Sequence, residues 1–447
     1  MVAYDHARSP GAFGRSTRGS FGAPVRSKAR EGGRLSAVLR AAAVVMLLNF
    51  DVFPRLMGRS FLVVAVLLAV PLALHEILRV SSRARVVVFW SLLIFGILAS
   101  PGILSPPQTE YGQQKLLLLV TLTMAAALAV AVLRGRRDVE MFAVLFALCG
   151  LVLAVAALTG ESEAGRASGF GSNPIWLGRA IGGGILALTW LCLRKRITAT
   201  WAAGPMVLLF LGLFATGSRG PLLATVLALF VLVLAGLRMR KSRRAWGALA
   251  LMGTLAMAVA AMPSLIPPRM YELVVDPSDE LFDSTRATMR EVTLPIIAEH
   301  PGGVGYGNWG IHAGMEIHKY PHNLWLELPA EAGWLVAGAF GLAVLTVVTG
   351  LWHAARRDPA AGFVLALVAF YAVAVSTSGD INGDRPLFAA LALGVLVLSG
   401  ATMPRVWRRP RTGRAGVGGR GVPPPPAVHP WRGAGLPVPI GPARGVE

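Results

Sequence analysis

The chain has 447 residues, of which 54% are hydrophobic and only 15% are charged, and its formal net charge is +20. A soluble globular protein usually carries about 25% charged residues, so this composition excludes an ordinary soluble domain. The two cysteines, Cys149 and Cys192, both lie inside apolar runs, where they read as small packing residues. Neither a disulfide framework nor a zinc site is expected.

Apolar segments of roughly 18 or more residues recur along the chain between short basic connections, as membrane-spanning helices do. We predict about twelve helices. In chain order they lie near residues 36–53, 60–78, 86–100, 115–133, 139–159, 175–193, 197–215, 220–237, 245–265, 333–352, 359–376 and 387–403. The predicted fold class is an all-α polytopic membrane protein with a large loop between the ninth and tenth helices.

The basic residues indicate how this bundle is oriented. If the N-terminus is cytoplasmic, the Arg- and Lys-rich connections 79–85, 134–137, 194–196 and 238–244 all fall on the cytoplasmic side, as the positive-inside rule requires. We therefore expect a multi-pass membrane protein with both termini in the cytoplasm. The positive charge then reflects topology and attraction to the anionic inner leaflet, and it does not imply nucleic acid.

The same pattern divides the chain into five regions. These are a basic, disordered N-terminal segment (1–35), helices one to nine (36–265), a large external loop (266–332), helices ten to twelve (333–403) and a Pro/Gly/Arg-rich, disordered tail (404–447). We expect the first helix to be uncleaved and not part of a signal peptide. A connection as long as 266–332 in a compact protein is usually functional. We expect it to carry functional residues on the external side.

Several arginines lie on the external side, where the positive-inside rule makes them less expected. They are Arg179, Arg219, Arg286, Arg290 and Arg385. Arg179 falls about one turn inside the sixth helix, where an arginine costs roughly 2.5 kcal/mol or more and suggests a function. The alternative is a salt bridge, for example between Arg385 and Asp380 or Asp384, or snorkelling to the headgroups. For Arg219 and Arg290 a functional role is favoured.

The stretch YPHNLWLELPAEAG, residues 320–333, is unusually polar for the entrance of a membrane helix. It sets His322 and Asn323 among aromatics, and we expect Pro329 to break any helix between Glu327 and Glu331. His318 and His322 have the spacing of two metal ligands on a helix, but Pro321 between them disfavours that helix. No metal site is predicted.

A Gly-rich fragment, GVGYGNWG, precedes this stretch at residues 303–310. It is superficially similar to a nucleotide-binding fingerprint. It follows no predicted strand and opens no βαβ unit, so we reject that interpretation.

The polar residues resemble the signatures of a known family. His322-Asn323, nine further residues and then Gly333 match the H[NSQ]-x9-G signature of bacterial O-antigen ligases, and the segment from Arg290 to Leu294 matches their R-x3-L pattern. Arg219, in a Ser-Arg-Gly turn before a helix, is similar to an external arginine of the same superfamily. The chain therefore resembles the O-antigen ligase and O-antigen polymerase superfamily.

The resemblance implies a glycosyltransferase that uses a lipid-linked donor. It would move a glycan from an undecaprenyl (polyprenyl) diphosphate carrier to an acceptor hydroxyl, on a lipid A-core sugar or a growing glycan, at the periplasmic face. The reaction would be inverting and metal-independent, with no cofactor. Two alternatives stay open: a repeat-unit polymerase of the same superfamily, and a membrane transporter or flippase.

The resemblance also suggests roles for individual residues. Arg219 and Arg290, with Arg286 and Arg179, would bind the donor diphosphate, because a guanidinium suits bidentate contact with phosphate. His322 would accept the proton of the acceptor hydroxyl. Asn323 would cap the following helix or orient the imidazole, and Gly333 would serve the helix entrance. Three aromatics, Trp309, Tyr320 and Trp325, would either stack on sugars or anchor the protein at the interface.

Overall fold

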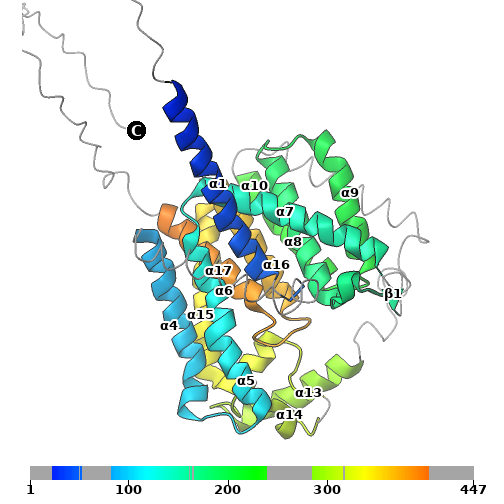
Figure 1. Ribbon diagram of the computed structural model, residues 1–447. Helices are drawn as coiled ribbons and strands as arrows, with labels where there is room; N and C mark the ends of the chain where they lie inside the picture. The colour runs from blue at the N-terminus through cyan, green and yellow to red at the C-terminus, as the bar shows by residue number, and fades with distance from the viewer. Residues whose placement is uncertain are drawn as a thin grey trace, which may run out of the picture. The chain divides into compact units, whose positions relative to one another are not determined.

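The computed structural model describes most of the chain (Figure 1). The described residues are 23–49, 51–52, 82–160, 162–163, 166–238, 284–315 and 318–401. They fall within one compact unit, Met1–Thr402. The predicted helices near 60–78 and 245–265 and the predicted tail, 404–447, lie outside the described residues.

Helices make up nearly all of the described secondary structure. The apolar helices are α1 (Ala23–Leu48), α4 (Ser82–Leu104), α5 (Glu110–Leu118), η1 (Leu119–Thr123), α6 (Met124–Ala129), η2 (Val130–Val132), α7 (Arg136–Thr159), α8 (Pro174–Leu193), α9 (Ala199–Ala215), α10 (Arg219–Arg238), α15 (Leu324–Ala354), α16 (Pro359–Ala374) and α17 (Arg385–Ala401). The other helical elements are η3 (Gly169–Gly171), α13 (Ser284–Glu299) and α14 (Trp309–His312). One two-stranded antiparallel hairpin pairs β1 (Ser162–Glu163) with β2 (Arg166–Ala167).

Six of the described helices are long and apolar enough to cross a membrane. They are Arg83–Leu104, Glu110–Val132, Arg136–Thr159, Pro174–Leu193, Arg219–Leu237 and Leu324–Ala354, and shorter apolar helices cover Leu35–Leu48, Ala199–Ala215, Pro359–Ala374 and Arg385–Gly400. Each predicted segment in the described part of the chain corresponds to one of these helices. The structure is thus consistent with an all-α membrane protein, whereas the count of twelve spans stays a prediction.

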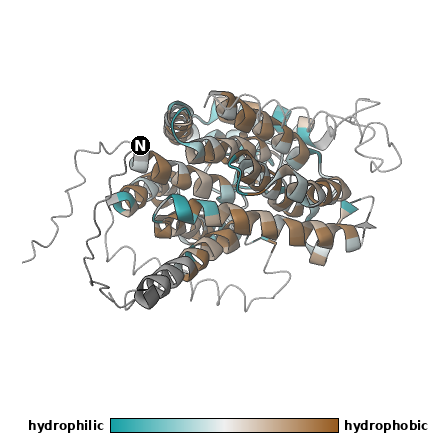
Figure 2. Ribbon diagram, turned by 90° about the horizontal axis from the view of Figure 1, so that it is seen from above, coloured by the Kyte–Doolittle hydropathy of each residue, from teal (hydrophilic) through white to brown (hydrophobic). Residues whose placement is uncertain are grey.

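Small residues let the central helices approach closely. A Cβ on Gly150 of α7 would lie 3.0 Å from the Cα of Gly184 in α8, and a Cβ on Gly212 of α9 would lie 2.6 Å from the Cα of Ala154. Such contacts between small residues are typical of helix packing in membranes. Hydrophobic residues cover much of the helical surface (Figure 2), and α4 exposes Phe89 and Trp90. Lipid contact accounts for apolar side chains on the outside.

Helix α15 is bent where the stretch YPHNLWLELPAEAG ends. It begins at Leu324, includes Pro329, and leaves helical geometry only at Gly333, where φ is 84° and ψ is 167°. The prediction that Pro329 separates Glu327 from Glu331 is wrong, and both carboxylates lie on one helical segment. Pro329 lies in the second turn, where its missing N–H removes a single intrahelical hydrogen bond.

The Gly-rich fragment satisfies the backbone groups that this bend releases. Val304 and Gly305 donate to the carbonyls of Ala330 and Glu331 at 2.8 and 2.9 Å. Beyond the bend, the N–H of Trp334 donates to the carbonyl of Pro301 at 3.0 Å. Buried backbone groups need such partners, so the fragment resembling a nucleotide fingerprint has a structural role as the partner of α15.

The bend gives a stability prediction. Gly333→Ala places a Cβ 2.6 Å from the backbone of Gly302 and forces a side chain into a conformation that is essentially restricted to glycine. Such a conformation costs about 1–3 kcal/mol before the clash is added. We expect a lower midpoint of thermal unfolding in detergent. Gly338→Ala in the same helix, where no atom lies within 4 Å of the new Cβ, should not lower it; equal effects of the two variants would contradict this role for Gly333.

Candidate active site

The connection between α16 and α17, residues 375–384, gathers elements that are far apart in the sequence. The N–H of Leu324, at the start of α15, donates to the carbonyl of Val375 at 3.0 Å. Near the start of α10, a Cβ on Gly220 would lie 2.3 Å from Oγ1 of Thr377. Tyr111 of α5 donates its hydroxyl to Asp380 at 3.3 Å. The start of α10, where Arg219 lies, and the start of α15, which directly follows His322 and Asn323, therefore meet around this connection.

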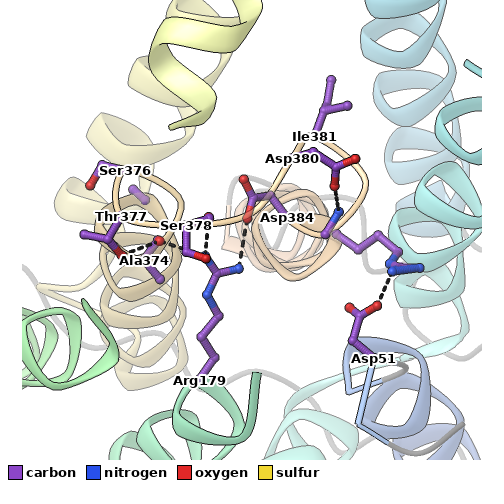
Figure 3. A network of polar contacts seen from close by, with 12 residues as sticks. Asp51, Arg179, Ala374, Ser376, Thr377, Ser378, Asp380, Ile381 and Asp384 are labelled. Carbon is purple, nitrogen blue, oxygen red and sulfur yellow. Dashed lines mark hydrogen bonds and ion pairs between the residues drawn. The ribbon is translucent and has the colours of Figure 1, made fainter. Parts of the chain in front are cut away.

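Arg179 lies inside this arrangement (Figure 3). Its side chain is 4% exposed, and one guanidinium nitrogen lies 2.9 Å from Asp384. The other donates to the carbonyls of Ala374 and Ser378, both at 2.7 Å. Because the guanidinium is buried and has three protein acceptors, Arg179 attaches the 375–384 connection to α8. These internal partners take the place of the predicted diphosphate.

Arg385 also has a different partner from the one that sequence suggested. It pairs with Asp51, which follows α1. Burial raises the pKa of Asp51, and the charge of Arg385 opposes that shift. Burial likewise raises the pKa of Asp384 to about 8, against the opposing charge of Arg179. Each carboxylate thus depends on its own arginine, and the two pairs tie both ends of the site to the bundle.

A buried ion triad lies beneath the connection. The ammonium of Lys115 lies 2.6 Å from Glu327 and 2.5 Å from Glu331, and all three side chains are at most 1% exposed. Glu327 also accepts the N–H of Ile381 at 3.1 Å, and the carbonyl of Lys115 accepts from Asn382 at 2.9 Å. The triad therefore joins α5, α15 and the connection at one point.

Sequence reasoning did not single out this triad. A lysine at the start of an apolar segment is normally read as an interfacial residue whose ammonium reaches water. Its partner Glu331 lies 216 residues further along the chain. The available signal was the i,i+4 spacing of Glu327 and Glu331 in an otherwise apolar helix, which places both carboxylates on one face and calls for a buried cation.

His322 lies immediately before α15 in a left-handed backbone conformation, with φ at 54°. Its ring centroid lies 4.3 Å from that of Tyr320 and 6.2 Å from that of His318. Asn323 is the N-cap of α15, since its side chain accepts the N–H of Trp325 at 3.0 Å, which confirms the predicted capping. Among the described residues, no three His, Cys, Asp or Glu side chains are grouped to hold a metal ion.

The other predicted arginines lie on two different elements. Arg219 is the first residue of α10 and is half-buried, whereas Arg286 and Arg290 are exposed one turn apart on α13. The opposite face of α13 is apolar, and its Met289 packs in a cluster with Trp309 and Ala330. Arg219 thus lies beside the 375–384 connection, while Arg286 and Arg290 lie on a helix that packs against α15.

The three aromatics behave differently from one another. Trp309 is fully buried and donates to Thr293 at 2.9 Å. Trp325 donates to the carbonyl of Ala372 at 3.2 Å. Both indoles therefore serve packing, and Tyr320 is the one that adjoins His322.

Comparison with known families bears directly on this region. Residues 204–341 match the family model described as O-antigen ligase. This match confirms the resemblance to the O-antigen ligase and polymerase superfamily. The matched region contains Arg219, Arg286, Arg290, His322 and Gly333, and it supports an enzymatic role. No curated protein matches the chain.

Proposed function

We propose that the protein transfers a glycan from a polyprenyl diphosphate carrier to the hydroxyl of an acceptor sugar at the external face of the bacterial inner membrane. The observation that carries this proposal is the family match, which spans Arg219, Arg290 and His322. The structure supports it by seating Arg219 and His322 on two elements that contact the same connection. Undecaprenyl diphosphate is the proposed carrier, and both termini are proposed to be cytoplasmic.

The reaction needs stabilisation of negative charge on the diphosphate leaving group and removal of the proton from the acceptor hydroxyl. As the acceptor oxygen attacks the anomeric carbon, the bond from that carbon to the diphosphate oxygen breaks and negative charge grows on the diphosphate. Arginine guanidinium groups stabilise such charge, and we assign this to Arg219 and Arg290, with Arg286 assisting. His322 accepts the hydroxyl proton. Direct attack inverts the anomeric configuration.

The identity of the acceptor separates a ligase from a polymerase. A ligase uses a lipid A-core sugar, whereas a polymerase uses the lipid-linked repeat unit of another chain. We favour the ligase because the His-Asn-x9-Gly spacing is that of the ligase signature. A transporter would move substrate across the membrane of proteoliposomes and form no new glycosidic bond.

The deciding experiment offers purified protein a radiolabelled undecaprenyl diphosphate glycan together with either lipid A-core or a second lipid-linked repeat unit. Labelled glycan on lipid A-core supports the ligase, and a lengthened lipid-linked glycan supports the polymerase. Transport without a covalent product would overturn the proposal. Activity that a chelator abolishes and a divalent cation restores would overturn the metal-independent mechanism.

The arginine assignment predicts a specific loss. We expect Arg219→Ala and Arg290→Ala each to lower kcat/KM for the lipid-linked donor by roughly 10²–10³-fold, as removal of one preorganised donor to a developing anion does. Lysine at either position should recover part of this, since it keeps the charge without the bidentate geometry. Arg356→Ala, a change at another exposed arginine, is the control. Wild-type donor kinetics in both variants would contradict the assignment.

A further inference from the structure

Beside His322 lies a group of polar and aromatic side chains to which the proposed mechanism gives no task. We call Tyr111, Lys319, Tyr320 and Asp380 the Asp380 cluster. The Tyr111 hydroxyl donates to Asp380 at 3.3 Å, and the ammonium of Lys319 lies 5.2 Å from the Tyr111 ring. Three separate segments of the chain build this cluster: α5, the residues before α15, and the 375–384 connection.

The cluster reaches the proposed base through Tyr320. The ring of Tyr320 is 4.3 Å from that of His322, and it is covalently next to Lys319. Burial raises the pKa of Tyr320 to about 12, and the carboxylate charge of Asp380 adds to the shift. Tyr320 joins the cluster through Lys319, whose ammonium lies over the Tyr111 ring, and Tyr111 in turn donates to Asp380.

The cluster is accessible, unlike the ion triad beneath it. Tyr111, Tyr320 and Asp380 are half-buried and Lys319 is exposed. The ammonium of Lys115, which is fully buried, lies 5.5 Å from the Tyr111 ring. The buried triad thus supports the Tyr111 ring from inside the protein. The Asp380 cluster keeps polar groups accessible to a ligand.

The carboxylate of Asp380 indicates which substrate the cluster contacts. A carboxylate repels a diphosphate, because like charges that lie close together near a protein surface destabilise each other. The arginines assigned to the diphosphate lie on α10 and α13 instead. A carboxylate that accepts from the hydroxyl of Tyr111, with a second phenol ring in the same cluster, suits a neutral polyol. The carboxylate accepts hydrogen bonds from hydroxyls, and the rings pack against C–H faces.

We propose that the Asp380 cluster binds a neutral sugar ring of the acceptor and presents its hydroxyl to His322. Asp380 accepts hydrogen bonds from hydroxyls of this ring, Tyr111 and Tyr320 pack against its apolar face, and Lys319 donates to a ring hydroxyl. This inference rests on the proposed glycosyl transfer and adds an acceptor subsite to it.

The test separates the two substrates kinetically. With the acceptor that supports turnover of the wild-type protein, lipid A-core or the lipid-linked repeat unit, Asp380→Asn and Tyr111→Leu should each raise the acceptor KM about tenfold. The KM for the donor should stay within twofold of wild type. Tyr111→Phe, which keeps the ring, should have an acceptor KM much closer to that of wild type than Tyr111→Leu has. Tyr306→Phe removes a buried hydroxyl that donates to Leu98 at 2.5 Å, and as the structural control it should leave the ratio of the two KM values unchanged.

A second measurement does not depend on turnover. Saturation-transfer NMR with the soluble core oligosaccharide, or with the free repeat-unit oligosaccharide, should show binding to wild type and a weaker signal with Asp380→Asn. If the wild type transfers glycan but these variants keep the wild-type acceptor KM, or raise the donor KM instead, the subsite is refuted while the proposed function stands. If the wild type transfers no glycan to either acceptor, the proposed function itself fails.

Discussion

His322→Ala should lower the rate of glycan transfer by roughly 10²–10⁴-fold, the usual contribution of a positioned general base. The remaining activity would come from the arginines and from the bound orientation of the two substrates. His322 lies between Tyr320 and the N-cap Asn323, so removal of its ring leaves the capping hydrogen bonds of α15 in place. We therefore expect the variant to fold, with donor and acceptor KM values close to those of wild type.

A matched control comes from the neighbouring histidine. His318→Ala removes a ring whose centroid lies 6.2 Å from that of His322, and it should retain most of the activity. The pH dependence adds a second criterion. If His322 is the base, kcat/KM should fall at acidic pH, where a protonated imidazole cannot accept the hydroxyl proton. The residual activity of His322→Ala should lack this fall. Wild-type transfer by a folded His322→Ala protein would disprove the assignment.

The helices were largely predictable from the sequence because long apolar runs are a local signal. Every predicted segment within the described residues is a helix, since runs of this length have few other solutions in a bilayer. Two helix starts were exceptions. Helix α1 begins at Ala23, within the segment 1–35 that was predicted to be disordered, and the start of α15 was placed at residue 333 when the helix begins at Leu324. Glu327, Pro329 and Glu331 made this stretch look non-helical, and only a buried lysine from another helix makes it favourable.

The residues of the site fall into two groups for the same reason. His322, Arg219 and Arg290 stand out through motif spacing, which needs no knowledge of contacts. The partners of Arg179 and Arg385 could not be predicted, because two arginines and three aspartates from α8, α17 and their neighbours allow several pairings. The positions of the 375–384 connection and of the end of α1 in the bundle decide which carboxylate each arginine meets.

Removal of the lysine from the buried triad should have the largest effect on stability. Lys115→Met leaves Glu327 and Glu331 facing each other without their cation, at sites that are at most 1% exposed. Breaking a buried ion pair by deleting one partner typically costs about 3–5 kcal/mol. We expect a sharply lower midpoint of thermal unfolding in detergent and a poor yield of monodisperse protein. Lys319→Met, an exposed lysine nearby, should leave the unfolding midpoint unchanged.

A compensated variant tests whether the lost charge or the changed shape of the side chain causes the loss of stability in Lys115→Met. Lys115→Met combined with Glu327→Gln and Glu331→Gln removes all three charges and keeps the carbonyl oxygen that accepts from Ile381. Because uncompensated buried charge is the main cost, this triple variant should recover most of the lost stability. Equal instability of the single and triple variants would mean that the packing of the lysine stem, and not its charge, holds α5 against α15. Recovered stability with lost transfer would instead show that the triad also positions Tyr111 and His322 for the reaction.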